Sequence, residues 1–231
     1  MTVIKCQVQS LVSLTPSVFK AILVPNQPVA FYAGQYLQFI MDEQDKRPFS
    51  IANRPNEAHL ELQIGAYGEE SYAMQVIDKL KNNRVVDIEI PFGDAYLRET
   101  SQRPIILLAG GTGFSYIKSM FEQLTVTNPN REVLIYWGLR EPNACFELAR
   151  TQATLGQLTN AQFTVVVEQP DEQWQGSVGL VHEVLMKQVG ELSKYDIYLA
   201  GRFDMVGKIR DDFQARGALL QHMYADAFAY L

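Results

Sequence analysis

The apolar residues of this chain change their spacing part-way along its length, and this change is the feature that most limits the fold. Up to residue 99 they fall in short runs, separated by turn-forming groups such as Pro25-Asn26 and Arg54-Pro55-Asn56. Short strands with frequent turns are typical of a small antiparallel barrel. After Pro104, continuous apolar runs alternate with stretches of helical spacing, which is typical of a parallel sheet covered on both faces. The sequence therefore predicts a β + α/β chain, with an antiparallel β-barrel domain over residues 1–99 and a parallel α/β domain over residues 104–231.

The predicted elements follow from these runs. Strands of the barrel are expected at residues 5–14, 18–24, 35–41, 60–64 and 85–90. One helix interrupts them at residues 71–80, because Ala73, Ile77 and Leu80 fall on one helical face. In the second domain we expect strands at residues 105–109, 133–137, 163–167 and 196–200, and helices at residues 115–124, 144–155, 178–189 and 205–215.

Charge and composition exclude several classes of protein. The formal net charge of -6 over 231 residues argues against nucleic-acid binding, since phosphates favour a basic surface. The N-terminus lacks the pattern of a secretory signal, and no apolar run reaches the roughly 20 residues of a membrane helix, so we expect a cytoplasmic protein without membrane contact. Cys6 and Cys145 are too few for a disulfide framework, zinc site or iron–sulfur cluster, and we interpret them as reduced structural thiols.

The strongest local signal is the segment Gly110-Gly111-Thr112-Gly113-Phe114, between the first predicted parallel strand and its helix. Glycines let the backbone turn tightly and approach a ligand, and the helix N-terminus behind them suits a pyrophosphate. The spacing departs from the usual dinucleotide fingerprint, because Tyr116 stands at the third glycine position. A glycine-rich turn without a ligand is the alternative. The position at the carboxyl end of a parallel strand favours a nucleotide.

Two further segments leave alternatives open. Gly201-Arg202 follows the fourth parallel strand, where it could lie against a flat ring or simply begin a helix. In the barrel, Pro48 fixes its own φ and biases Arg47 towards an extended conformation. The stiff segment Arg47-Pro48-Phe49-Ser50 can present a backbone edge and a hydroxyl to a planar heterocycle. Taken alone, however, it is better interpreted as an edge strand with a solvated arginine.

Together, in this order, the three segments resemble the ferredoxin–NADP reductase superfamily. Within it, the chain is similar over essentially its whole length to the bacterial NAD(P)H–flavin reductases, including those that supply luciferase. The residues that carry this second resemblance are Asp45-Lys46-Arg47-Pro48-Phe49-Ser50, Tyr136-Trp137-Gly138, Trp174-Gln175-Gly176 and Ala225-Asp226-Ala227-Phe228-Ala229-Tyr230.

The resemblance implies an enzyme in which NADH or NADPH transfers hydride from nicotinamide C4 to N5 of a free flavin, whether riboflavin, FMN or FAD. It implies flavin-binding roles for Arg47, Pro48, Phe49, Ser50 and Tyr230, with the catalytic Ser50 placed to hydrogen-bond N5. It implies nicotinamide-nucleotide roles for Gly110, Gly111, Thr112, Gly113, Phe114, Arg140, Gly201 and Arg202. Arg140 favours a ribose phosphate and the adjacent Glu141 a ribose hydroxyl, which leaves NADH and NADPH open.

Two departures from the family pattern matter. Many relatives have cysteine where this chain has Ala200, and proline where it has Phe203, so a catalytic cysteine is absent. Glu69 and Glu70, before the barrel helix, would repel the pyrophosphate of FAD. We therefore expect a flavin that binds loosely as a substrate and leaves reduced.

The reduced flavin would pass to flavin-dependent oxygenases, luciferase or ferric chelates. The alternatives are a reductase with tightly bound FAD that serves a protein partner, and a non-catalytic flavin carrier. The preferred flavin and the oligomeric state stay open.

Overall fold

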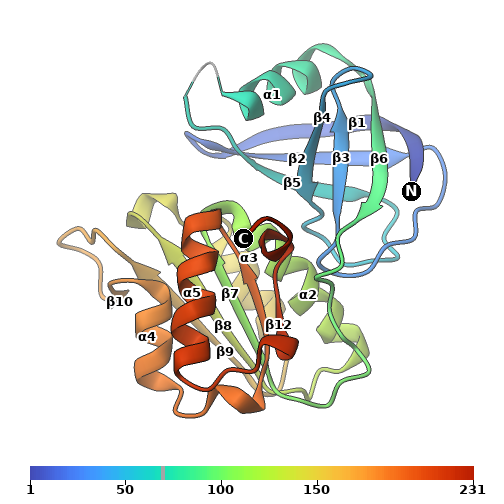
Figure 1. Ribbon diagram of the computed structural model, residues 1–231. Coiled ribbons are helices and arrows are strands. Elements are labelled where there is room, and N and C mark those ends of the chain that lie inside the picture. The colour runs from blue at the N-terminus through green and yellow to red at the C-terminus, as the bar shows by residue number, and fades with distance from the viewer. Residues whose placement is uncertain (69–70) are drawn as a thin grey trace.

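The computed structural model describes residues 1–68 and 71–231, and it contains one sheet in each half of the chain (Figure 1). Among the described residues, the first half forms a six-stranded antiparallel sheet in the order β4-β3-β6-β1-β2-β5. Its strands are β1 (Thr2–Thr15), β2 (Val18–Pro25), β3 (Tyr36–Ile40), β4 (Lys46–Ser50), β5 (Leu60–Gly65) and β6 (Val85–Phe92).

The barrel forms because alternate residues of these strands are apolar and face a common interior. Leu23, Phe39 and Leu62 are fully buried there, from three different strands. The chain after β4 bends back towards β5, where the Ala52 N–H donates to the Glu61 carbonyl at 2.8 Å. Helix α1 (Tyr72–Asn82) packs on the barrel through Val76, Ile77 and Leu80, and its first turn is capped by Ser71, whose hydroxyl accepts from the Met74 N–H.

The second half forms a six-stranded parallel sheet, counted over the described residues, in the order β10-β9-β8-β7-β11-β12. Its strands are β7 (Ile105–Gly110), β8 (Val133–Leu139), β9 (Ala161–Val167), β10 (Ser177–Val178), β11 (Asp196–Ala200) and β12 (Met223–Tyr224). The helices are α2 (Phe114–Thr127), α3 (Leu148–Leu155), α4 (Val181–Gln188) and α5 (Phe203–Ala215).

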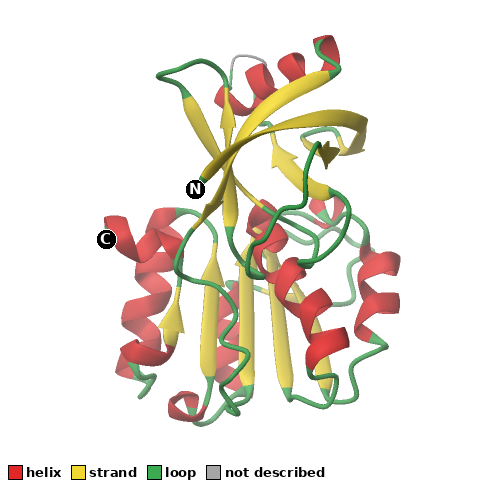
Figure 2. Cartoon of the chain, turned by 90° about the vertical axis from the view of Figure 1, so that its right-hand side faces the viewer, coloured by secondary structure: helices red, strands yellow, loops and turns green. Residues whose placement is uncertain are grey.

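Helices cover both faces of this sheet, which explains why its central strands are continuously apolar (Figure 2). Along β7, Ile105 and Leu107 lie in the core beneath α2 and α3, whereas Ile106 and Leu108 lie in the core beneath α4 and α5. The predicted fold class, a barrel followed by a parallel α/β half, is confirmed.

The structure corrects the starts of two predicted helices. The helix predicted at residues 144–155 begins only at Leu148, because Pro142–Ala144 form a separate 3-10 turn and Glu147 has a φ of 52°. The helix predicted at residues 178–189 begins at Val181, because Ser177–Val178 pair with β9 as the short strand β10. Strands β10 and β12 have two residues each, too few to show a periodic pattern.

The connection between the sheets runs from residue 93 to residue 104 and contacts both of them. The Leu97 N–H donates to the Ala33 carbonyl in the barrel, and the Arg98 N–H donates to the Tyr198 hydroxyl in the other half, at 2.8 Å. The predicted boundary between residues 99 and 104 falls within this connection. The last turn of the chain, η5 (Asp226–Tyr230), returns to the barrel (Figure 1). In the described part of the chain, no helix has both the length and the apolar character to cross a bilayer.

Candidate active site between the two halves

The loops after β7 and β11 lie side by side at the edge of the parallel sheet that faces the barrel (Figure 1). They touch at Gly113. A Cβ on Gly113 would lie 2.8 Å from the carbonyl carbon and oxygen of Ala200, and 3.0 Å from the Gly201 nitrogen. Such contacts are too short for any side chain, so glycine is required where the two loops meet. Because β7 has β8 on one side and β11 on the other, this is the switch point at which open α/β sheets bind ligands.

The first glycine loop is held from below by buried aromatic residues. Gly111 has a φ of 53°, and its carbonyl accepts a hydrogen bond of 2.9 Å from the Trp137 indole N–H. Trp137 is fully buried and stacks on Phe114 with 4.1 Å between the ring centroids. The Phe114 side chain therefore lies in the core, and only its backbone faces the loop. The 3-10 turn η1 (Gly111–Gly113) continues directly into α2, and the Phe114 N–H donates to the Gly111 carbonyl. The first amides of this helical segment therefore belong to the glycine loop, at the positive end of the helix dipole.

On the barrel side, β4 is the edge strand of the sheet. The Ile51 N–H donates to the Gln35 carbonyl at 3.1 Å, and Ser50 pairs with Tyr36. N–H groups alternate in direction along an antiparallel pair, so the Ser50 N–H points away from β3. The backbone nitrogen of Pro48 faces the same way, but proline has no N–H to donate. The free edge of β4 therefore offers the amide and hydroxyl of half-buried Ser50.

Arg47 on the same strand is buried, with 8% of its surface exposed. Its guanidinium pairs with Asp45 and donates to the Tyr72 carbonyl at the start of α1. The hydrogen bond with Asp45 raises the pKa of Arg47 and lowers the pKa of Asp45. The edge-strand interpretation of this segment is confirmed, and the solvated arginine is wrong, because α1 packs over the side chain.

Helix α2 connects the glycine loop to the barrel segment that follows Ser50. The Lys118 ammonium donates to the Ala52 carbonyl at 3.2 Å, and the Ser119 hydroxyl donates to the Asn53 carbonyl at 2.8 Å. One turn further, the Glu122 carboxylate accepts from the Arg54 N–H at 3.2 Å. Helix α2 thus begins at the glycine loop, and its side chains bind the residues that directly follow the end of β4.

The C-terminal turn brings Tyr230 to the same region. Burial raises the pKa of Tyr36, the partner of Ser50, and the nearby Asp226 and Tyr230 add to the increase. The Tyr230 ring lies 5.5 Å from the ring of Phe203, which follows the second glycine loop. Both rings are largely exposed, at 74% and 56%. The structure therefore brings Ser50, Tyr230 and the second glycine loop to one side of the junction.

The other candidate residues lie at the periphery of this region. Arg140 and Glu141 are exposed after the end of β8, next to the first glycine loop in the sheet. Arg202 is exposed and forms an ion pair with Asp204 at 2.8 Å. Glu69 and Glu70 lie outside the described residues, so their predicted effect on a flavin pyrophosphate stays a prediction.

Sequence reasoning missed the polar face of α2 and the partner of Arg47. Ser115, Lys118, Ser119 and Gln123 are buried polar residues of α2, and polar residues at helical spacing are a signal that could have been used. Asp45 had no comparable signal, because an acid two residues before an arginine is common on any edge strand.

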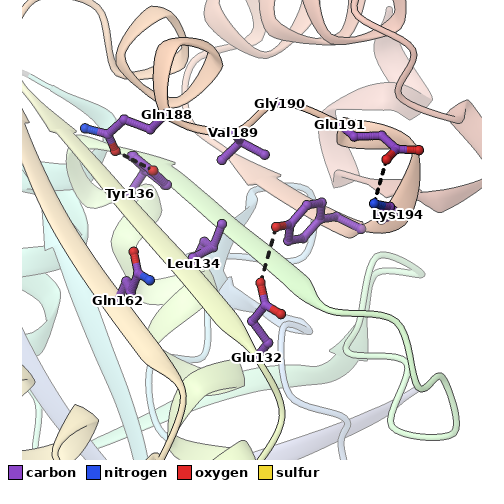
Figure 3. Close-up of a pocket in the computed structure, with 10 residues that line it drawn as sticks. Glu132, Leu134, Tyr136, Gln162, Gln188, Val189, Gly190, Glu191 and Lys194 are labelled. Atoms are coloured by element: carbon purple, nitrogen blue, oxygen red, sulfur yellow. Dashed lines mark hydrogen bonds and ion pairs between the residues drawn. The ribbon is translucent and has the colours of Figure 1, made fainter.

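A cavity of about 300 Å³ lies elsewhere, between the amino ends of β8 and β9 and the end of α4 (Figure 3). Its walls include the Tyr195–Glu132 and Tyr136–Gln188 hydrogen bonds, at 3.3 and 2.7 Å. The glycine loops follow the opposite, carboxyl ends of the strands, so this cavity is separate from the candidate site.

Comparison with known proteins assigns the family. The sequence model described as the oxidoreductase NAD-binding domain matches residues 107–211, which include both glycine loops. The chain is 39% identical to an NAD(P)H-flavin reductase of Vibrio harveyi and 38% identical to one of Aliivibrio fischeri, over 99% of each chain. This chain belongs to the NAD(P)H–flavin reductase family. The resemblance predicted from the ordered motifs is confirmed, and the protein is an oxidoreductase.

The fold of this family member also matches more distant structures. The ferredoxin reductase in carbazole 1,9a-dioxygenase has a TM-score of 0.88 at 23% identity, covering 98% of this chain and 69% of that chain. The likeness concerns the arrangement of barrel and parallel sheet. It agrees with the predicted fold class.

The junction fits the two ligands of a flavin reductase. Any side chain at Gly113 would collide with the second glycine loop, and the amides at the start of the helical segment, in the first glycine loop, suit a pyrophosphate. The open β4 edge suits the hydrogen-bonding edge of a flavin. Burial raises the pKa of Cys6 to about 12 and that of Cys145 to about 11, which favours the protonated thiol at both positions.

Proposed function

We propose that this enzyme reduces free riboflavin, FMN or FAD with NADH or NADPH. Hydride, carrying two electrons, moves from nicotinamide C4 to flavin N5, and uptake of one proton completes the reduced flavin. The observation that carries the proposal is the physical connection between the two loops. Helix α2 begins at the glycine loop and binds the segment beyond Ser50 through Lys118 and Ser119.

The roles of the residues follow from their positions. The loop Gly110–Phe114 would hold the pyrophosphate, while Gly201 and Arg202 would lie beside the nicotinamide. On the barrel side, Pro48 and Phe49 would support the flavin and Ser50 would hydrogen-bond N5. Tyr230 would cover the flavin ring from the C-terminus. No group here needs to remove a proton for hydride transfer, so the protein's contribution is binding and orientation.

Arg140 would contact the adenosine ribose of the nicotinamide nucleotide. Its guanidinium suits a 2′-phosphate, and the neighbouring Glu141 suits a 2′-hydroxyl. The two residues support acceptance of both nucleotides.

The reduced flavin would leave the enzyme and serve a flavin-dependent oxygenase, luciferase or a ferric chelate. Support comes from the edge position of β4, which exposes the proposed flavin site on one side. A flavin bound at this edge would contact β4 and one C-terminal aromatic residue, which favours weak binding and release.

The test uses dialysed protein, to which NADH or NADPH is added with riboflavin, FMN or FAD. We expect a colourless preparation that oxidises the nicotinamide only when flavin is present. Yellow protein that retains FAD through dialysis would favour the reductase with a bound cofactor. Flavin binding without nicotinamide oxidation would favour a carrier and contradict the proposal.

A further inference from the structure

One face of β5 meets the first glycine loop and helix α2 in a row of matched contacts. Alternate residues share a face of a strand, and on β5 these are Glu61, Gln63 and Gly65. Residues three apart share a face of a helical segment, and here these are Thr112, Ser115 and Lys118. The pair furthest from the loop is the ion pair of Lys118 with Glu61, at 3.3 Å.

The other two pairs bring β5 to the glycine loop itself. The Ser115 hydroxyl donates to the side-chain carbonyl of Gln63 at 3.1 Å. At Gly65, a Cβ would lie 2.9 Å from Cγ2 of Thr112, so the strand needs glycine where it approaches the loop. The barrel therefore contacts the proposed pyrophosphate loop directly, and not only through the helix behind it.

The side-chain amide of Gln63 uses both of its N–H donors in this contact. Besides accepting from Ser115, it donates to the Glu61 carboxylate at 3.1 Å and to the Glu147 carboxylate at 2.9 Å. Only 5% of Gln63 is exposed. Because Ser115 stands two residues after Gly113, this one amide connects the barrel to the end of the glycine loop.

Glu147 gives Gln63 a second connection to the same loop. Its φ of 52° is costly for a residue other than glycine and persists only where the surroundings hold it. The preceding residue, Phe146, packs edge-on against Trp137 with 4.9 Å between the ring centroids. Trp137 in turn binds the Gly111 carbonyl. Gln63 thus acts on the glycine loop from two sides.

On the barrel side, β5 is bound to the segment that follows the proposed flavin strand. The Glu61 N–H donates to the Asn53 side-chain oxygen at 2.7 Å, and the Ala52 N–H donates to the Glu61 carbonyl at 2.8 Å. Ala52 is two residues beyond Ser50. One strand therefore has the proposed hydride-acceptor site attached to its backbone and the nucleotide loop attached to its side chains.

We propose that Gln63 is a positioning residue for hydride transfer, which fixes the glycine loop against the barrel through Ser115 and Glu147. This inference rests on the proposed function. Without Gln63 each ligand would still bind to its own half of the molecule. Nicotinamide C4 and flavin N5 would meet less often at reactive distance, and the rate depends steeply on that alignment.

The test follows the bleaching of riboflavin in a single turnover, with the enzyme in excess and NADH varied. Gln63→Met keeps a side chain of similar length and removes all three hydrogen bonds. The maximal rate should fall by about tenfold. The enzyme and NADH concentrations that give half of this rate should change by less than about twofold, since binding is retained.

Ser115→Ala deletes one oxygen atom from the same contact, and it keeps the inference testable where Gln63→Met does not fold. It should lower the maximal rate by about threefold or more. In the double variant the loss should be smaller than the product of the two single losses, because both substitutions remove the same hydrogen bond.

Gln123→Met is the matched control. Gln123 is also buried, with 7% exposed, and its amide donates to Glu99 at 3.1 Å near the other end of α2. The same substitution there removes a buried amide from this helix without touching the glycine loop. Its maximal rate should stay within about twofold of the wild type.

Equal slowing in Gln63→Met and Gln123→Met would reveal a general loosening of the fold and overturn the inference. So would a wild-type maximal rate in Gln63→Met or in Ser115→Ala, or effects of the two that simply multiply. A normal maximal rate that needs more NADH would make Gln63 a binding residue, which also contradicts positioning. A wild-type enzyme that bleaches flavin with neither NADH nor NADPH contradicts the proposed function instead.

Discussion

Ser50 illustrates how the place of a residue in a sheet determines which hydrogen-bonding groups it presents. It lies on an edge strand, and its amide points away from the neighbouring strand. Pro48, two residues earlier, faces the same way but has no N–H to donate. The position therefore concentrates hydrogen-bonding capacity at one spot. A flavin at this edge would meet the Ser50 amide and hydroxyl together.

Removal of the Ser50 hydroxyl should slow flavin reduction more than it weakens nucleotide binding. We predict that Ser50→Ala lowers kcat by about 10- to 100-fold, because a donor aimed at the reacting atom is lost. The KM for NADH should change little. Steady-state kinetics measure both, with Ser13→Ala as a control on an exposed strand position of the barrel. A normal kcat in Ser50→Ala would refute the catalytic role.

Asp226 is a second residue whose environment has a measurable effect. It lies beside Gly93 at the junction, and burial raises its pKa to about 6. The native state therefore binds the proton more tightly than the unfolded chain does. The stabilisation is fully present below the unfolded pKa of about 4, and it is lost as the pH rises through 6.

We predict that Asp226→Asn is more stable than the wild type at about pH 7.5, by up to about 3 kcal/mol, and equally stable below about pH 4. Urea unfolding at several pH values measures this difference. The control is Asp78→Asn, which changes an exposed carboxyl on α1. A stability difference that does not depend on pH would contradict the raised pKa.

At the scale of elements, the sequence predicted most of what local patterns can encode. Strand β7 and helix α2 follow from a continuous apolar run and a helical repeat, and the glycines mark the turn between them. The start of α3 could not be predicted, because Glu147 has a positive φ that Lys20 and Gln63, distant in sequence, help to hold. Likewise, nothing local shows that α1 covers Arg47.

The contact between the two glycine loops leads to a prediction at this scale. Gly113→Ala would place a Cβ 2.8 Å from the Ala200 carbonyl and force the loops apart. We expect the KM for NADH to rise about tenfold or more, with the KM for riboflavin little changed, since the β4 edge is untouched. Gly190→Ala is the control, because a Cβ there would meet nothing within 4 Å. Equal effects on both substrates would argue against separate binding elements.

At the scale of the whole molecule, buried charges join the barrel to the α/β half. Lys118 on α2 lies 3.3 Å from Glu61 on β5, and both side chains are almost fully buried. Lys20 pairs with Glu147 across the same junction, from 127 residues away. The sequence predicted each half, but it could not predict these pairs, because charged partners so distant in sequence leave no periodic signal.

The buried pairs should make the two halves unfold together. Lys118→Met leaves the Glu61 carboxylate buried without its nearest cation, which should cost roughly 3–5 kcal/mol. Trp137 and Trp174 both lie in the second half, so tryptophan fluorescence reports on that half, whereas far-ultraviolet circular dichroism reports on both. In the wild type we expect the two urea transitions to coincide, and in Lys118→Met we expect them to separate at a lower midpoint.

Lys194→Met is the control, because it breaks an exposed ion pair and should change the free energy of unfolding by less than about 1 kcal/mol. Coincident transitions at the wild-type midpoint in Lys118→Met would show that the junction contributes no coupling, and that contacts within each half alone maintain the geometry on which hydride transfer depends.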